Sequence, residues 1–134
     1  MFYLESSYAT EMIAHAREEA QNECCGVLAG SNGRVKRLFR AANALKSPVR
    51  YSVDPRDLLL IHRELDAHGW DVVGVYHSHT HSPAYPSATD IELAFWPDSL
   101  YVIISLMEPE RPVIRAFRIG EGRVEEEEIR LVER

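Results

Sequence analysis

Residues 100–106 form an almost unbroken apolar run, and they constrain the fold more than any other part of the chain. A strand with apolar side chains on both faces is stable at the centre of a sheet that is covered on both sides. The segment from Trp70 to Tyr76 is also mostly apolar and predicts a second buried strand. The sequence therefore predicts a sheet with helices packed around it, in an α+β or mixed α/β fold.

Two amphipathic helices are expected beside this sheet. The first follows Ser6 or Ser7, either of which can cap it, and apolar residues recur along it at helical spacing. On that helix we expect His15 to be exposed to solvent. The second helix begins at Asp54, which precedes a proline, and ends at Gly69.

Shorter elements complete the predicted domain. Asn32-Gly33 indicates the tip of a β-hairpin, because both residues tolerate positive φ. Ala88–Phe95 is expected to be a short helix, and residues 123–134 a final strand or tail. Since the sequence contains no repeat and no linker, residues 1–134 are expected to form one domain.

Composition disfavours several classes of function. The formal net charge of −6 does not suit a nucleic-acid partner, which needs a basic surface. The two cysteines, Cys24 and Cys25, are adjacent and unsuited to a disulfide with each other, which is typical of a reducing compartment. Neither a signal peptide nor a membrane-spanning segment is indicated. We expect a cytoplasmic protein without a membrane partner, and we leave assembly into a homo-oligomer open.

A candidate metal site follows the buried strand directly. His77 and His79 alternate, so their side chains point to the same face of a strand and can reach one ion. A catalytic zinc site needs a third protein ligand and one open position for water. Two residues can supply this ligand: His81, the next alternate histidine, or Asp90 after a turn-rich loop.

Other interpretations of these acidic residues remain open from the residues alone. Ser87 and Asp90 have the spacing of a helix cap, in which the serine is the N-cap and the acidic residue stands at the third helical position. Glu23 precedes a short apolar strand and could act as a general base for a metal-bound water. Taken alone, Glu23 is better interpreted as a surface residue that ends the first helix.

Taken together, Glu23 and the pattern His-x-His-x7-Ser-x2-Asp, formed by His77, His79, Ser87 and Asp90, resemble the signature of the JAMM, or MPN+, zinc metalloproteases. The resemblance is closest to the compact prokaryotic type. It implies a curved mixed β-sheet flanked by helices, in the cytidine-deaminase-like JAMM/MPN architecture. It also implies one Zn²⁺ per chain held by the two histidines and Asp90, with Glu23 as general base and Ser87 stabilising the oxyanion.

One departure from this family is visible. The residue after the second histidine is often proline in the family, whereas Thr80 stands here, followed by His81. This difference changes the loop beside the site.

The resemblance further implies the reaction and the partner. Such enzymes are peptidases or isopeptidases that hydrolyse the bond after the C-terminal Gly-Gly tail of a ubiquitin-like or sulfur-carrier protein. The loop between Ala41 and Tyr51 is a candidate for binding that tail.

Three alternatives are kept beside this reading. The first is a non-catalytic MPN-type scaffold or binding module. The second is the DNA-repair-associated branch of the fold, which typically has asparagine between the two histidines where Ser78 stands here. The third is a metalloenzyme of another class that uses His77, His79 and His81 as ligands.

Overall fold

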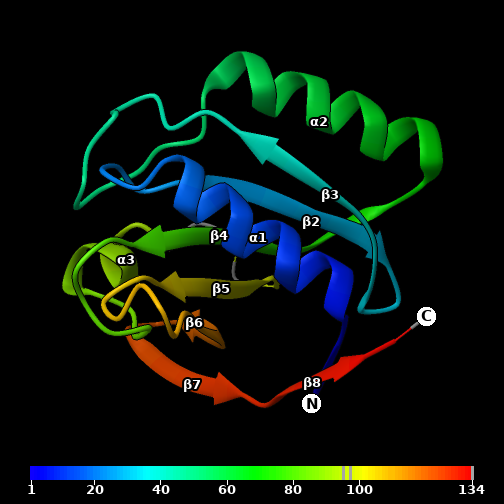
Figure 1. The fold of residues 1–134 in the computed structure, drawn as a ribbon. Helices are drawn as coiled ribbons and strands as arrows, with labels where there is room; N and C mark the ends of the chain where they lie inside the picture. Colours follow the sequence, from blue (N-terminus) through cyan, green and yellow to red (C-terminus); the bar gives the residue numbers. More distant parts are fainter. Residues whose placement is uncertain (95, 97, 134) are drawn as a thin grey trace.

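The computed structural model describes residues 1–94, 96 and 98–133. Its helices are interspersed among strands in the first part of the chain, and the last four elements are strands, as expected for a mixed fold of helices and strands (Figure 1). In order they are β1 (Phe2–Glu5), α1 (Ser6–Glu18), β2 (Cys25–Ser31), β3 (Arg34–Ala41), α2 (Pro55–His68), β4 (Asp71–His79), α3 (Ala88–Glu92), β5 (Leu100–Ser105), β6 (Val113–Gly120), β7 (Arg123–Glu127) and β8 (Ile129–Val132).

The main sheet has the strand order β3-β2-β4-β5-β6-β7. Strands β4 and β5 run parallel to each other, and the other neighbours in this sheet are antiparallel. A separate two-stranded sheet joins β1 to β8 in parallel. The segment predicted as one final strand is therefore two strands, because β7 pairs with β6 whereas β8 pairs with β1.

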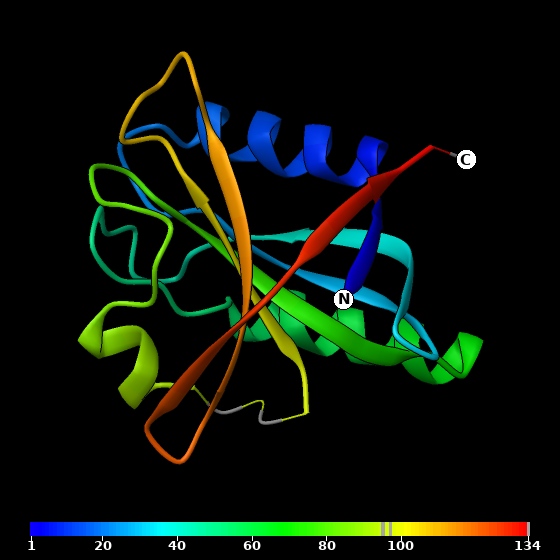
Figure 2. The same cartoon turned by 90° about the horizontal axis from the view of Figure 1, so that it is seen from below.

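Helices α1 and α2 lie on opposite faces of the main sheet (Figure 2). Side chains of α1 pack in one apolar core with Tyr76, Val102 and Ile104. Side chains of α2 contribute to a second core with Val75 and Ile103. Strand β5 is buried along its whole length, which confirms the prediction of a central strand covered on both faces.

Several local predictions are confirmed. Asp54 caps α2 by accepting a hydrogen bond from the Arg56 backbone N–H at 2.8 Å, and Gly69 ends the helix in the left-handed conformation. Asn32 and Gly33 form the tip of the β2–β3 hairpin, both with positive φ. Both cysteines are buried and free.

Three local predictions differ from the structure. Neither Ser6 nor Ser7 caps α1: the N-cap is Glu5, and the Ser6 hydroxyl donates to the Val132 carbonyl of β8. His15 is buried rather than exposed to solvent. It faces the main sheet, where its Nδ1 lies 2.7 Å from the Tyr76 hydroxyl. Helix α3 ends at Glu92, and the predicted end at Phe95 lies outside the described residues.

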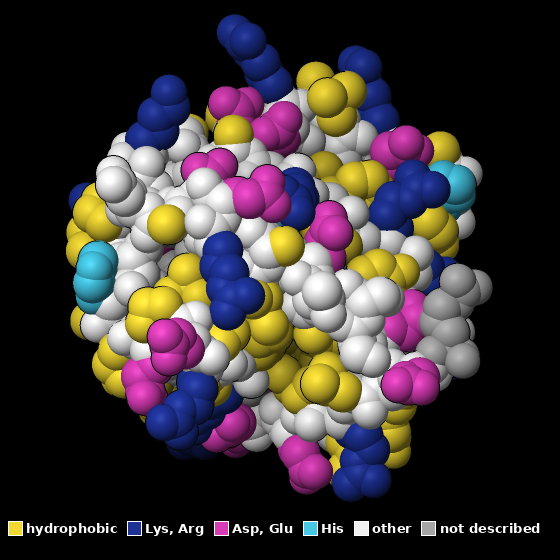
Figure 3. Space-filling model, viewed as in Figure 1, with side chains coloured by type: hydrophobic (Ala, Val, Ile, Leu, Met, Phe, Trp, Pro, Cys, Tyr) yellow, Lys and Arg dark blue, Asp and Glu magenta, His cyan; other side chains and the backbone are white. Residues whose placement is uncertain are grey.

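The surface carries both signs of charge. On the face seen in Figure 3, acidic and basic side chains are intermixed rather than gathered by sign. Among the described residues, no helix is long and apolar enough to cross a membrane.

Candidate metal centre

Strand β4 positions the two histidines. Its partners are β2 on one side and β5 on the other, and pairing with β5 continues to His79↔Ser105, so the strand extends three residues beyond the predicted end at Tyr76. Alternation along β4 places Tyr76 in the core under α1 and Val75 in the core under α2. His77 and His79 share the face of Val75, and both side chains are buried.

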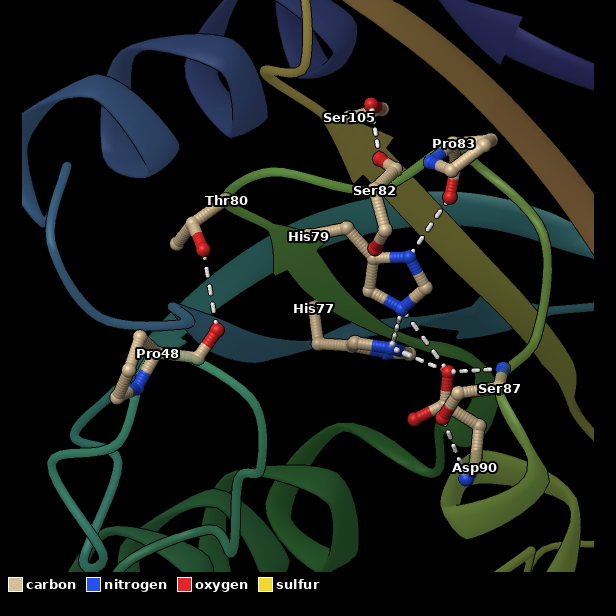
Figure 4. A network of polar contacts seen from close by, with 9 residues as sticks. All are labelled: Pro48, His77, His79, Thr80, Ser82, Pro83, Ser87, Asp90 and Ser105. Atoms are coloured by element: carbon tan, nitrogen blue, oxygen red, sulfur yellow. Dashed lines mark hydrogen bonds and ion pairs between the residues drawn. The ribbon is translucent and has the colours of Figure 1, made fainter.

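Three ligand atoms from β4 and α3 converge at the end of this strand (Figure 4). The Nε2 atoms of His77 and His79 lie 3.2 Å apart, and Asp90 Oδ2 lies 3.2 Å from the first and 2.9 Å from the second. Tetrahedral ligands of zinc, each about 2.05 Å from the ion, are separated by about 3.3 Å. The three atoms therefore have nearly the mutual spacing that one such ion requires.

The hydrogen bonding of His79 also suits a metal ligand. Its Nδ1 lies 2.8 Å from the Pro83 carbonyl oxygen, which can only accept, so Nδ1 carries a hydrogen. The neutral imidazole then has its lone pair on Nε2, which faces Asp90. Burial lowers the pKa of His79, but the hydrogen bonds to Asp90 and to the Pro83 carbonyl, together with the charges of Asp90 and Glu23, raise it above its ordinary value.

Asp90 is held by the first turn of α3. Its Oδ2 accepts the Ser87 backbone N–H at 2.9 Å, and the Asp90 backbone N–H donates to Ser87 Oγ at 3.1 Å, which completes a capping box. Burial alone would raise the pKa of Asp90, but hydrogen bonds from His77 and His79 hold it well below its ordinary value. The helix cap and the metal ligand, weighed as alternatives in the sequence, are compatible in one side chain.

Glu23 lies two residues before the start of β2 and is buried rather than exposed. Its backbone N–H donates to the Ser47 carbonyl at 2.8 Å, whereas its Oε1 is buried without a hydrogen-bond partner among the described residues. Burial raises the pKa of Glu23 to about 8; the charge of His79 opposes this shift and that of Asp90 adds to it. A buried carboxylate oxygen without a partner among the described residues, within electrostatic range of two candidate ligands, is suited to accept a hydrogen bond from a water at the centre.

The contact between Tyr51 and His77 was not predicted from the sequence. The Tyr51 ring stacks on the His77 imidazole, with centroids 4.5 Å apart and an angle of 18° between the planes. Tyr51 belongs to the loop between β3 and α2, which has no periodicity, so only its place in the predicted tail-binding loop pointed to it. Burial lowers the pKa of His77 and thus favours the neutral form that binds metals.

A groove of about 580 Å³ begins at Asp90 and runs between this loop, α2 and α3. Its lining is mainly apolar and includes Leu45, Arg50, Tyr51, Leu58, Leu93 and Trp96. Of the three residues that could hold a metal, Asp90 therefore lines this groove.

His81 is separate from this group. The cluster of ligand atoms within 4.8 Å of one another, searched over the described residues, contains His77, His79 and Asp90. His81 is exposed, and its Nδ1 lies 2.9 Å from the Thr80 hydroxyl.

A mixed sheet and a short helix that bring two imidazoles and a carboxylate together, with the carboxylate lining a groove, define a candidate metalloprotein of the α/β class. Residues 5–120 match the family described as prokaryotic homologs of the JAB domain, and the chain belongs to that family. The resemblance seen in the sequence is thereby confirmed.

Two relatives have names that state an activity. The chain is 43% identical over 124 residues to a CysO-cysteine peptidase of Mycobacterium tuberculosis, covering 91% of this chain and 85% of the relative. It is 43% identical over 101 residues to a desampylase of Haloferax volcanii, covering 70% of this chain and 73% of the relative.

Solved structures show the same fold. A protein from Desulfitobacterium hafniense superposes with a TM-score of 0.90 at 43% identity, over 100% of this chain and 94% of the other. A JAB1/MPN domain protein from Archaeoglobus fulgidus superposes with a TM-score of 0.67 at 18% identity, over 99% and 98%. The second likeness concerns the fold alone, and it confirms the predicted JAMM/MPN architecture.

Proposed function

We propose that the protein is a zinc-dependent peptidase or isopeptidase that hydrolyses the bond after the C-terminal Gly-Gly tail of a ubiquitin-like or sulfur-carrier protein. The observation that carries the proposal is the convergence of His77, His79 and Asp90 beside the unpaired carboxylate oxygen of Glu23. The relatives named CysO-cysteine peptidase and desampylase support the substrate class. The two free cysteines suit a reducing compartment and support the proposal of a cytoplasmic location.

In this proposal His77, His79 and Asp90 hold one Zn²⁺ per chain. The donor set of two imidazoles and one carboxylate is typical of catalytic zinc. A bound zinc ion would supply an activated water and polarise the scissile carbonyl. The Pro83 carbonyl and the Ser87 N–H keep His79 and Asp90 turned toward the ion.

Glu23 acts as the general base and then the general acid. Its Oε1 accepts a proton from the attacking water, and it later returns that proton to the leaving amine. Because burial already favours the protonated form, the carboxyl group holds the proton between the two steps. Ser87 Oγ accepts the Asp90 N–H, so its hydroxyl hydrogen is free to donate to the developing oxyanion.

The groove beside Asp90 receives the extended tail of the modifier. The groove is lined mainly by apolar side chains, and the loop that contains Arg50 and Tyr51 forms one of its walls. A tail without side chains at its last two positions can approach the metal closely. The intermixed surface charge offers no basic area for a nucleic acid on the face seen in Figure 3.

The test begins with metal content. We expect about one zinc per chain in the wild type and in His81→Ala, and loss of zinc in Asp90→Ala. His81→Ala is the matched control, because His81 is an imidazole of the same segment outside the ligand cluster. Zinc lost with His81→Ala but kept with Asp90→Ala would favour the His-x-His-x-His class of enzyme instead.

Activity is then measured on ubiquitin-like proteins that end in Gly-Gly joined to an amino acid, a peptide or a lysine side chain. Glu23→Gln should keep the zinc and lose at least about 100-fold in kcat, the loss expected for a general base. If the zinc-loaded wild type cleaves none of these substrates, the function of the protein would be better explained as that of a non-catalytic MPN-type scaffold. Cleavage by Glu23→Gln at the wild-type rate would exclude the proposed role of Glu23.

A further inference from the structure

The loop between β3 and α2, residues 42–53, touches the candidate metal centre at several points. The Ser47 carbonyl accepts the Glu23 N–H at 2.8 Å, the Pro48 carbonyl accepts the Thr80 hydroxyl at 3.0 Å, and the Tyr51 ring stacks on His77. This loop therefore contacts the proposed base and one proposed ligand, and it also lines the groove. An interaction that holds this loop in place therefore also holds the groove wall in place relative to the candidate metal centre.

Thr80, the residue after the end of β4, holds this loop through its side chain. It directly follows the proposed ligand His79 and is buried. Because the Pro48 carbonyl can only accept, the single hydroxyl hydrogen of Thr80 points to Pro48. The Thr80 hydroxyl oxygen then accepts from His81 Nδ1–H at 2.9 Å, so the direction of the hydroxyl is set from both sides.

The base of the loop has its own support. Asn43 Nδ2 donates to the carbonyls of Glu23 and Arg50, and Asn43 Oδ1 accepts the backbone N–H groups of Leu45 and Ser52. Loss of the Thr80 contact would therefore leave both Glu23 and the part of the loop that Asn43 supports in place. The part released would be the segment at Pro48, which directly precedes the groove-lining residues Arg50 and Tyr51.

We propose that Thr80 is a positioning residue, whose hydroxyl fastens the loop against the metal-binding strand and so sets the width of the groove that receives the modifier tail. The effect of Thr80 on substrate binding rests on the proposed function. The hydrogen bond to Pro48 and the stacking of Tyr51 carry the proposal independently of the reaction. The role is specific to the hydroxyl, so serine should preserve it and valine should not.

The experiment compares the zinc-loaded wild type with Thr80→Val and Thr80→Ser. Valine keeps the branched shape and removes the donor, whereas serine keeps the donor and removes the methyl group. Amide hydrogen exchange of residues 42–53 should become about three- to tenfold faster in Thr80→Val, the change expected from loss of one hydrogen bond. Thr80→Ser should exchange at nearly the wild-type rate, and zinc content should be equal in all three.

Kinetics on a Gly-Gly-tailed substrate give the second measurement. Thr80→Val should raise KM by about three- to tenfold while kcat stays within about twofold, because the groove is affected and Glu23 is not. Thr80→Ser should restore the wild-type KM. A general loss of folding would lower zinc content and kcat together, and so differs from this pattern.

The outcomes separate the two proposals. Unchanged loop exchange in Thr80→Val, or equal behaviour of Thr80→Ser and Thr80→Val, would overturn the role of the hydroxyl. If the wild type cleaves none of the substrates while the exchange difference persists, fastening of the loop is supported and the proposed function is what fails.

Discussion

Ser78 and Cys24 are joined by two hydrogen bonds between β4 and the residue before β2. The Cys24 backbone N–H donates to Ser78 Oγ at 2.8 Å, and the Ser78 backbone N–H donates to the Cys24 carbonyl at 3.2 Å. Ser78 lies between the two histidines, and Cys24 directly follows Glu23. This pair of bonds therefore ties the proposed base to the strand that holds two proposed ligands.

Replacement of Ser78 by alanine should destabilise the protein. The Cys24 N–H is buried and would lose its acceptor, which costs about 1–3 kcal/mol. We expect a lower midpoint in urea unfolding with an unchanged slope. Ser7→Ala, at an exposed position of α1, is the control and should stay within about 0.5 kcal/mol of the wild type. Equal stability of both variants would show that the side-chain bond contributes nothing.

Ser87 should contribute to stability and to the reaction by different amounts. Ser87→Ala removes the helix cap, which costs about 1 kcal/mol of unfolding free energy. It also removes the hydroxyl proposed to stabilise the oxyanion, so kcat should fall by about 100- to 1,000-fold. Ser87→Thr keeps both functions of the hydroxyl and should recover most of the activity. A fall in kcat no greater than tenfold for the alanine variant would limit Ser87 to the cap.

The stability of the metal-free protein should decrease as pH rises through the titration of Glu23. Its pKa is raised from 4.5 to about 8 in the folded protein, so the folded state binds more protons than the unfolded state between these values. The unfolding free energy from this group is therefore largest below pH 4.5 and declines as pH increases toward 8. Urea unfolding at several pH values should show this slope in the wild type.

The matched variant for that measurement is Glu23→Gln, which has similar shape and no titration. Its stability should be less dependent on pH over the same window. If both proteins follow the same pH dependence, the raised pKa of Glu23 is refuted.

Gly26 should tolerate no side chain. A Cβ at this position would overlap the buried Tyr76 ring and approach the Phe39 carbonyl oxygen to 2.5 Å. We expect Gly26→Ala to lose about 1–3 kcal/mol in unfolding free energy, the usual range for overpacking. Gly120→Ala is the control, because no atom lies within 4 Å of its added Cβ. A wild-type stability for Gly26→Ala would mean that Tyr76 can move without cost.

The sequence predicted the elements and the candidate site where the relevant signal is local. The apolar run of β5, the proline and glycine that bound α2, and the Asn-Gly turn are each specified by neighbouring residues. The alternation of His77 and His79 needs only the geometry of a strand. These are the features on which prediction and structure agree.

The features that the sequence did not reveal depend on distant partners. His15 is three residues after Met12 on the inner side of α1, but its burial depends on Tyr76, which is 61 residues away. The stacking of Tyr51 on His77 depends on an irregular loop. Similarly, the change of sheet between β7 and β8 depends on pairing with β1, at the other end of the described chain.

The capping box of α3 has a further consequence for metal binding. The Ser87 N–H donates to the Asp90 oxygen that also faces both imidazoles, so the carboxylate is oriented when the helix forms. The conformational entropy of that side chain is lost during folding rather than during capture of the ion. The affinity of the centre for a metal should therefore follow the helical content of residues 88–92, and a substitution that unwinds this single turn would weaken binding without touching a ligand.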